Sequence, residues 1–172
     1  MRKPTPLLPF AIACAVIVVT ASAPAAAAAT GPAAAGFDKL KSLVGTWEGK
    51  SPEGEAVTVT YSLIAGGNTL MEQLSHGNMV TMYHVDGDSL LLTHYCMANN
   101  EPRMRAKGLS ADGKRLEFKF VDAANLAKPT DMHMHSLTLT FQDADHVTQE
   151  WVNSTEGKEQ PASFPLTRRS AR

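Results

Sequence analysis

The sequence predicts an all-β protein, a closed up-and-down antiparallel barrel of about ten strands with a short N-terminal helix at the barrel bottom. Two observations lead to this prediction. From residue 45 onward, apolar and polar residues alternate in short runs that are separated by turn residues. A short apolar segment with helical spacing precedes the first of these runs. Closure is favoured over an open sheet because it removes the exposed edges that an open sheet would leave.

The helix is expected over residues 39–44, with Asp38 as its cap, and its apolar stripe would close the bottom of the barrel. The stretch Gly45-Thr46-Trp47-Glu48-Gly49 follows and opens the first strand. Trp47 is predicted to form the floor of the barrel. Gly45 and Gly49 have no side chains, so they would let other backbone approach the indole closely. The simpler alternative is that Trp47 is a large core residue without a role in a ligand site.

The remaining strands are expected where alternation with a period of two is bounded by turns. The clearest is the run from Val57 to Leu63, and Asp86-Gly87-Asp88 is the strongest hairpin signal. The expected strands after the first cover residues 57–63, 69–75, 79–85, 89–97, 103–109, 115–120, 132–141, 147–152 and 163–168.

Residues 1–30 are expected to be a cleaved signal peptide. Arg2 and Lys3 give a basic start, an apolar run extends from Leu7 to Val19, and small residues follow from Ala21. The run is too short and its end too rich in alanine for a preferred membrane span. We therefore expect one barrel domain over residues 36–169 that is exported to the periplasm or secreted, with no membrane span in the mature protein. The alanine-rich leader is typical of bacteria.

Charge and cysteine content exclude several classes of function. The net charge is −1, and loss of Arg2 and Lys3 takes it to about −3, so no basic excess indicates a nucleic-acid partner. Cys14 would leave with the leader, so Cys96 remains alone and the domain has no internal disulfide. The sequence contains no diagnostic catalytic motif and gives no indication of oligomeric state.

Leu40, Leu43, Gly45, Trp47 and Gly49 together resemble the opening of the calycin superfamily, which includes the lipocalins, the fatty-acid-binding proteins and the nitrobindin-like barrels. In lipocalins, a basic residue near the end of the last strand packs on the tryptophan of a G-x-W motif. The resemblance implies that role for Arg168, and a guanidinium over an indole contributes on the order of 1 kcal/mol. The alternative is that Arg168 belongs to a solvated tail.

About ten strands fit the fatty-acid-binding and nitrobindin branches better than the eight-stranded lipocalins. The chain lacks the helical lid and the last-strand R-x-Y of the first branch, and the C-terminal histidine of the second. It is most similar to small, exported, lipocalin-like proteins of bacteria that have no assigned activity.

The leading hypothesis is a binding protein whose cavity holds a small apolar or amphipathic molecule, without a cofactor. The residues expected to line this cavity are Val59, Tyr61, Leu92, His94, Phe118, His133, His135, Leu137, Leu139 and Trp151. One alternative hypothesis is a structural or interaction protein whose barrel is simply filled. The many large apolar residues expected to face inward slightly favour a filled core over a roomy cavity.

The other alternative hypothesis is a metal or haem site at His94, His133 and His135. Alternation places His133 and His135 on one face of a strand, about 7 Å apart, where both imidazoles could bind zinc. The alternative is that these histidines are hydrogen-bonded or face solvent near the barrel mouth.

Three further groups have open interpretations. Glu72 is expected either as an interior carboxylate that anchors a ligand or as an outward side chain. Cys96 is expected to pack as a small apolar residue, and its alternative role is that of a nucleophile beside His94. Arg103, Arg105 and Lys107 are expected to face outward near Glu117, while the opposite phase would place them in the cavity toward an anionic ligand.

Overall fold

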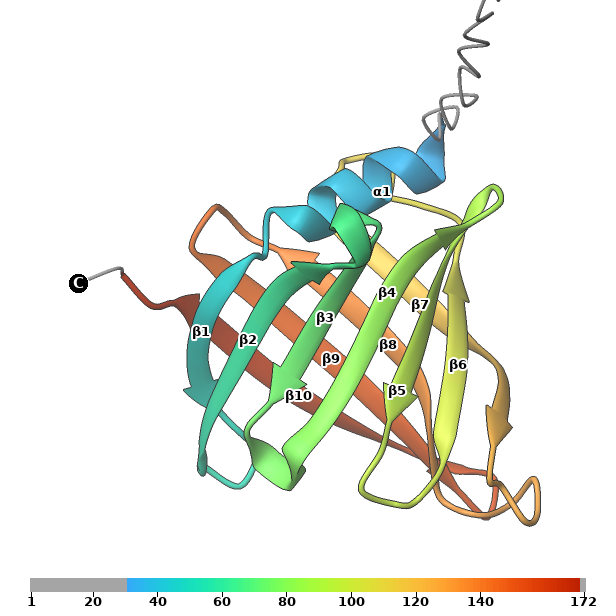
Figure 1. Ribbon diagram of the computed structural model, residues 1–172. Helices are drawn as coiled ribbons and strands as arrows, with labels where there is room; N and C mark the ends of the chain where they lie inside the picture. Colours follow the sequence, from blue (N-terminus) through green and yellow to red (C-terminus); the bar gives the residue numbers. More distant parts are fainter. Residues whose placement is uncertain (1–30, 171–172) are drawn as a thin grey trace, which may run out of the picture.

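The computed structural model describes residues 31–170, which form one closed barrel of ten antiparallel strands with a helix across one end (Figure 1). The elements are α1 (Pro32–Lys41), β1 (Gly45–Lys50), β2 (Ala56–Ile64), β3 (Thr69–Leu74), β4 (Met79–Asp86), β5 (Ser89–Tyr95), β6 (Glu101–Ala106), β7 (Arg115–Ala124), β8 (His133–Phe141), β9 (His146–Thr155) and β10 (Lys158–Arg168). Short 3₁₀ turns, Ala65–Gly67 and His76–Asn78, precede β3 and β4. Each strand pairs with its neighbours in sequence, and β10 closes the barrel on β1. The predicted fold class is confirmed.

Helix α1 begins at Pro32, well before the expected start near residue 39. Proline is favoured in the first turn of a helix, and the alanines that follow have high helix propensity. The helix was predicted from the spacing of larger apolar residues, which begins only at Phe37, and the alanines before it add no such spacing. Asp38 lies inside the helix, where its carboxylate pairs with Lys41 at 2.9 Å, and it is not the cap. The predicted signal peptide lies outside the described residues.

Strand β10 begins at Lys158, although the sequence predicted a start at residue 163 because of Pro161. The strand pairs with β9 from Lys158 to Thr167, but with β1 only from Leu166 to Arg168. The first part of β10 therefore has one unpaired side, where a missing N–H breaks no ladder hydrogen bond. Proline is tolerated there for that reason.

The two ends of the barrel differ. At the helix end, defined by α1, the side chains of Phe37, Leu40 and Leu43 are buried and join the core. At the opposite end, which we call the loop end, lie the β5–β6 loop and the β7–β8 loop (Figure 1). The Asn100 amide of the first loop donates a hydrogen bond of 2.7 Å to the carbonyl of Met132, just before β8. Apolar packing seals the helix end, while loops meet at the other end.

Candidate functional site

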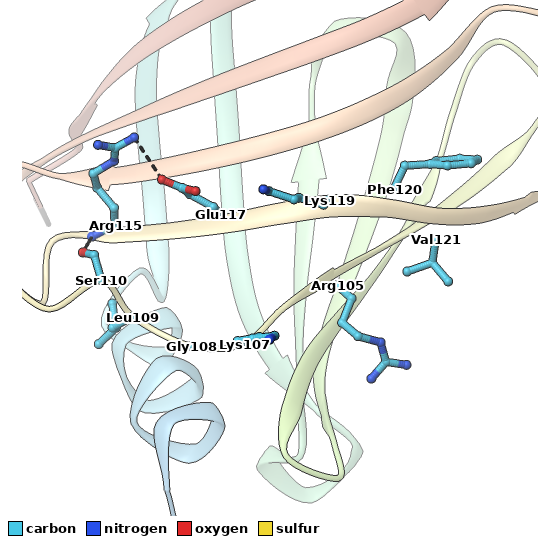
Figure 2. Close-up of a pocket in the computed structure, with 10 residues that line it drawn as sticks. All are labelled: Arg105, Lys107, Gly108, Leu109, Ser110, Arg115, Glu117, Lys119, Phe120 and Val121. Carbon is cyan, nitrogen blue, oxygen red and sulfur yellow. Dashed lines mark hydrogen bonds and ion pairs between the residues drawn. The ribbon is translucent and has the colours of Figure 1, made fainter.

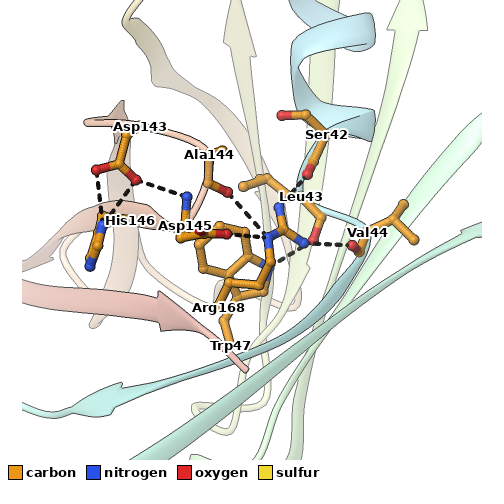
Figure 3. Close-up of polar contacts among 9 residues, drawn as sticks. All are labelled: Ser42, Leu43, Val44, Trp47, Asp143, Ala144, Asp145, His146 and Arg168. Carbon is orange, nitrogen blue, oxygen red and sulfur yellow. Dashed lines mark hydrogen bonds and ion pairs between the residues drawn. The ribbon is translucent and has the colours of Figure 1, made fainter. Parts of the chain in front are cut away.

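The predicted partnership of Trp47 and Arg168 closes the barrel between β1 and β10 (Figure 3). The two residues are paired in register, and the guanidinium carbon lies 4.2 Å from the indole centroid. The guanidinium also donates hydrogen bonds to three carbonyls, those of Ser42 at 2.6 Å, Val44 at 2.9 Å and Ala144 at 3.1 Å. Arg168 thus ties the turn after α1, the β8–β9 turn and β10 together, and it is not a solvated tail.

The glycines beside Trp47 allow close approaches, as expected, although their neighbours differ. A Cβ at Gly49 would lie 2.3 Å from the Pro165 carbonyl oxygen, so the backbone of β10 occupies that space. At Gly45, φ is +128°, and a Cβ would lie 3.2 Å from a guanidinium nitrogen of Arg168. Trp47 is buried and donates its indole N–H to the Leu43 carbonyl at 2.7 Å. These residues hold the helix end shut.

A buried hydrogen-bond network lies in the barrel interior, and we call it the carboxylate network. Its members are Tyr61 of β2, Glu72 of β3, Tyr83 of β4, and Gln149 and Trp151 of β9. The Tyr83 hydroxyl donates to one carboxylate oxygen of Glu72 at 2.5 Å, and the Gln149 amide donates to the other at 2.9 Å. The same amide reaches the Tyr61 hydroxyl at 2.5 Å, and the Trp151 indole N–H donates to the Gln149 oxygen at 3.1 Å. The open question about Glu72 is thereby answered, because its side chain faces inward.

Burial sets the protonation behaviour of this network. Removal from water raises the pKa of Glu72, and the hydrogen bonds from Tyr83 and Gln149 counteract this only in part. Burial and the nearby carboxylate of Glu72 raise the pKa of Tyr61 and of Tyr83 well above 10. The network includes no lysine or arginine. Its environment therefore favours neutral groups over an additional negative charge.

His94 lies beside the network. Its Nδ1 is 2.9 Å from the Thr81 hydroxyl, and its ring packs on Trp151 with centroids 4.9 Å apart. Burial lowers the pKa of His94 to about 4, so the ring is neutral near pH 7. A neutral imidazole, two phenols, an amide and an indole thus meet around one carboxyl group.

The residues expected to line a cavity are buried, with the exception of His135, and they are packed against one another. Apart from His135, which is half-buried, their exposed fractions are 4% or less. The aliphatic members among them, Val59, Leu92, Leu137 and Leu139, have 0% exposure. A side chain beside a water-sized void would retain accessible surface, so these four contact protein atoms on all sides. In this conformation, side chains fill the space that they enclose.

The expected histidine cluster is assembled only in part. His133 and His135 meet at the loop end, with Nε2 of the first 3.1 Å from Nδ1 of the second. A shift of register between Met134 and Ser136 breaks the simple alternation there, which the sequence did not reveal. Within residues 31–170, no group of three or more His, Cys, Asp or Glu side chains is arranged to hold a metal ion. His94 does not join the other two histidines in such a group.

The basic stripe faces outward, as expected, although its partners are not those predicted. Arg103 pairs with Asp122, and Arg105 pairs with Asp86 at 2.7 Å, whereas Glu117 pairs with Arg115. On the outer wall, β6 and β7 border a hollow of about 460 Å³ (Figure 2). Its charged lining is Arg105, Lys107, Arg115, Glu117 and Lys119. Cys96 is half-buried.

Sequence reasoning missed Tyr83 and Gln149 as members of the interior network. A signal for Gln149 was present, because it alternates with Val147 and Trp151 and therefore shares their inward face. For Tyr83 the sequence holds no comparable signal, because its inward direction follows from the β3–β4 register, which pairs it with the buried Leu70. Both were overlooked because polar atoms are usually assigned to the outside of a strand.

Comparison of this chain with protein-family models and with curated proteins gives no match. Among the helices within the described part of the chain, none has the length and apolar character needed to cross a membrane.

Proposed function

We propose that this protein is an exported, calycin-like binding protein, whose carboxylate network recognises the polar group of a small amphipathic molecule. One observation carries the proposal. A fully buried carboxyl group, that of Glu72, is hydrogen-bonded to side chains from two other strands in an otherwise apolar interior. Convergent polar groups inside an apolar enclosure are typical of ligand sites.

The cost of this arrangement supports a role beyond filling the barrel. Burying a carboxyl group is unfavourable unless hydrogen bonds compensate, and apolar side chains of similar volume often stabilise a core as well or better. The neighbouring layers of this barrel use Leu70, Leu92 and Leu137 for that purpose. A filled barrel has no need of Glu72 at its centre.

The chemistry of the network narrows the class of ligand. Phenol, amide and carboxyl groups donate and accept hydrogen bonds, while no cation is present to balance an anionic head group. A neutral hydroxyl or amide, or a cationic amine, therefore fits better than a carboxylate. Apolar side chains around the network would contact the remainder of the ligand.

Access is expected from the loop end, since α1 covers the helix end. Trp151, a member of the network, and His94, which packs on it, have 4% and 3% exposure, whereas Leu92, Leu137 and Leu139 have none. Binding requires these side chains to move, because the interior is filled in the conformation described.

The near-zero exposure of the interior favours a second candidate, a filled barrel that acts as a structural or interaction protein. This candidate predicts that Leu137→Ala costs about 2 to 5 kcal/mol of stability and changes no binding. The two candidates differ in whether any small molecule binds inside.

The first test is native mass spectrometry of the purified full chain, compared with its denatured mass. The second uses three probes with the same alkyl chain, dodecanol, dodecylamine and dodecanoate, and follows tryptophan emission. Trp151 belongs to the network and Trp47 lies at the helix end, so binding should change an emission component that Trp151→Phe removes. We expect dodecanol and dodecylamine to bind more tightly than dodecanoate.

Tyr83→Phe removes the hydroxyl that donates to Glu72, and Tyr95→Phe is its matched control because Tyr95 is 49% exposed. Loss of one hydrogen bond of about 1 kcal/mol should weaken binding about fivefold in the first variant only. A bare protein that binds none of the three probes would refute the proposal in favour of the filled barrel.

A further inference from the structure

Two imidazoles face each other at the loop end of the barrel, away from the carboxylate network. Nε2 of His133 lies 3.1 Å from Nδ1 of His135, and both residues are near the start of β8. His133 is buried, whereas the side chain of His135 is 38% exposed. The Phe120 ring stacks on His135 at an interplanar angle of 19° and packs on His133 with centroids 4.6 Å apart. The pair is therefore held by packing yet open to solvent on one side.

The far nitrogen of each ring also has a neighbour. Nδ1 of His133 is 2.8 Å from the Asp131 carbonyl oxygen, which can only accept a hydrogen bond. His133 therefore carries its proton on Nδ1 when neutral, and the lone pair on Nε2 points toward His135. Nε2 of His135 lies 3.9 Å from a carboxylate oxygen of Glu159. Nδ1 of His135 lies within hydrogen-bond distance of the Nε2 lone pair of His133, so in the metal-free pair His135 donates its Nδ1 proton to His133. When an ion displaces this hydrogen bond, the proton of His135 moves to Nε2, on the side of the Glu159 carboxylate, and leaves the lone pair on Nδ1.

We propose that His133 and His135 form a two-histidine site for a divalent transition-metal ion, with Cu²⁺ bound most tightly. Two neighbouring nitrogens at about 2.0 Å from Cu²⁺ in tetragonal geometry lie about 2.8 Å apart, and two nitrogens at about 2.0 to 2.1 Å from Zn²⁺ in tetrahedral geometry lie about 3.3 Å apart. The observed separation of 3.1 Å lies between these two values, so the two nitrogens are already at the spacing that a single ion requires. Imidazole nitrogen suits copper and zinc, and copper(II) has the higher affinity for a given set of ligands.

The surroundings support the same assignment. A carbonyl or carboxylate on the far nitrogen orients a metal-binding histidine and raises its basicity, and here Asp131 and Glu159 hold these positions. A hollow of about 320 Å³ gives an ion a route to His135, and its lining also includes Lys119, Phe120, Ser136 and Glu159. Since no third His, Cys, Asp or Glu of residues 31–170 completes the group, water would fill the remaining positions. The site is separate from the interior network. A test that refutes the metal site therefore does not refute the proposed function, and a test that refutes the proposed function does not refute the metal site.

The test is a titration of the full chain with Cu²⁺, followed by calorimetry and by electron paramagnetic resonance. We expect one ion per chain, with coupling to two imidazole nitrogens. His135→Ala should abolish this signal, and Glu159→Gln should weaken affinity about tenfold. The matched control is His146→Ala, because His146 also has an exposed side chain next to a carboxylate, that of Asp143, but lies at the start of β9.

His135→Phe is a second variant that retains a ring for stacking on Phe120, and it should lose the ion while unfolding at the same denaturant concentration as the wild type. Binding that survives both substitutions of His135, or that is lost equally in His146→Ala, would overturn the proposal. A spectrum with one nitrogen, or with none, would do so as well.

Discussion

Replacing Arg168 by alanine should destabilise the protein by about 2 to 3 kcal/mol. The side chain makes hydrogen bonds to three carbonyls and stacks on Trp47 at 4.2 Å. Each hydrogen bond contributes about 1 kcal/mol net, and the stacking adds about 0.5 to 1 kcal/mol. The side chain is 27% exposed, so water replaces part of what is lost, and the expected value lies below the simple total.

The assay is equilibrium unfolding in urea, with intrinsic tryptophan emission as the signal. Arg168→Lys keeps the charge but loses the planar fork, and it should fall between the wild type and Arg168→Ala. Arg169→Ala is the matched control, because Arg169 makes an exposed ion pair with Glu48 and should cost less than 1 kcal/mol. Equal losses in Arg168→Ala and Arg169→Ala would refute the assignment of Arg168 as the residue that holds the barrel closed.

Three further predictions concern stability. Gly49→Ala should lower the free energy of unfolding, measured in urea, by more than about 2 kcal/mol, because its Cβ would lie 2.3 Å from the Pro165 carbonyl oxygen. A smaller loss would show that β1 and β10 separate easily. Burial lowers the pKa of His94 from 6.5 to about 4, so the unfolded chain takes up a proton at a higher pH than the folded protein does. As pH falls through this window, the free energy of unfolding of the wild type should decrease by about 3 kcal/mol. His94→Gln should lose correspondingly less between pH 7 and pH 4, and parallel curves would contradict this. Burial raises the pKa of Glu72 above 4.5, so the unfolded chain releases this proton at a lower pH than the folded protein does. The wild type should therefore lose stability relative to Glu72→Gln as pH rises from 4.5 through the folded-state pKa. A difference between these two proteins that is constant from pH 4 to pH 8 would show that Glu72 ionises as readily in the barrel as in water.

Much of the fold could be predicted because each strand carries its own signal. Alternation assigned the inward faces of β2, β7 and β8, and hairpin residues such as Asp86-Gly87-Asp88 placed the turns. Boundaries failed where two signals conflicted. Alanines such as those after Pro32 occur both in leaders and in helices, so the start of α1 was placed too late. Pro161 indicated a turn, whereas the structure places it in β10, where one side of the strand is unpaired.

The candidate site was less predictable, since it depends on register between strands distant in sequence. Gln149 donates to Tyr61 across 88 residues of sequence and to Glu72 across 77, and no local pattern brings these groups together. The geometry of the histidine pair could not be predicted for another reason. A register shift within β8 changes the direction of neighbouring side chains, and strict alternation cannot represent such a shift. The Trp47 and Arg168 partnership was found only through the resemblance to calycins.

The pairing of the first strand with the last also determines when folding can finish. Arg168 reaches the carbonyls of Val44 and Ser42 across 124 and 126 residues of sequence. During synthesis, β1 therefore waits for its partner until nearly the whole described chain is free. A chain halted before Leu166 presents the edge of β1 to other molecules, and such an edge is a template for aggregation. Because this contact is among the most distant in the sequence, barrel closure is expected to be slow, and a chaperone that holds extended chains has its longest opportunity to act before Arg168 emerges.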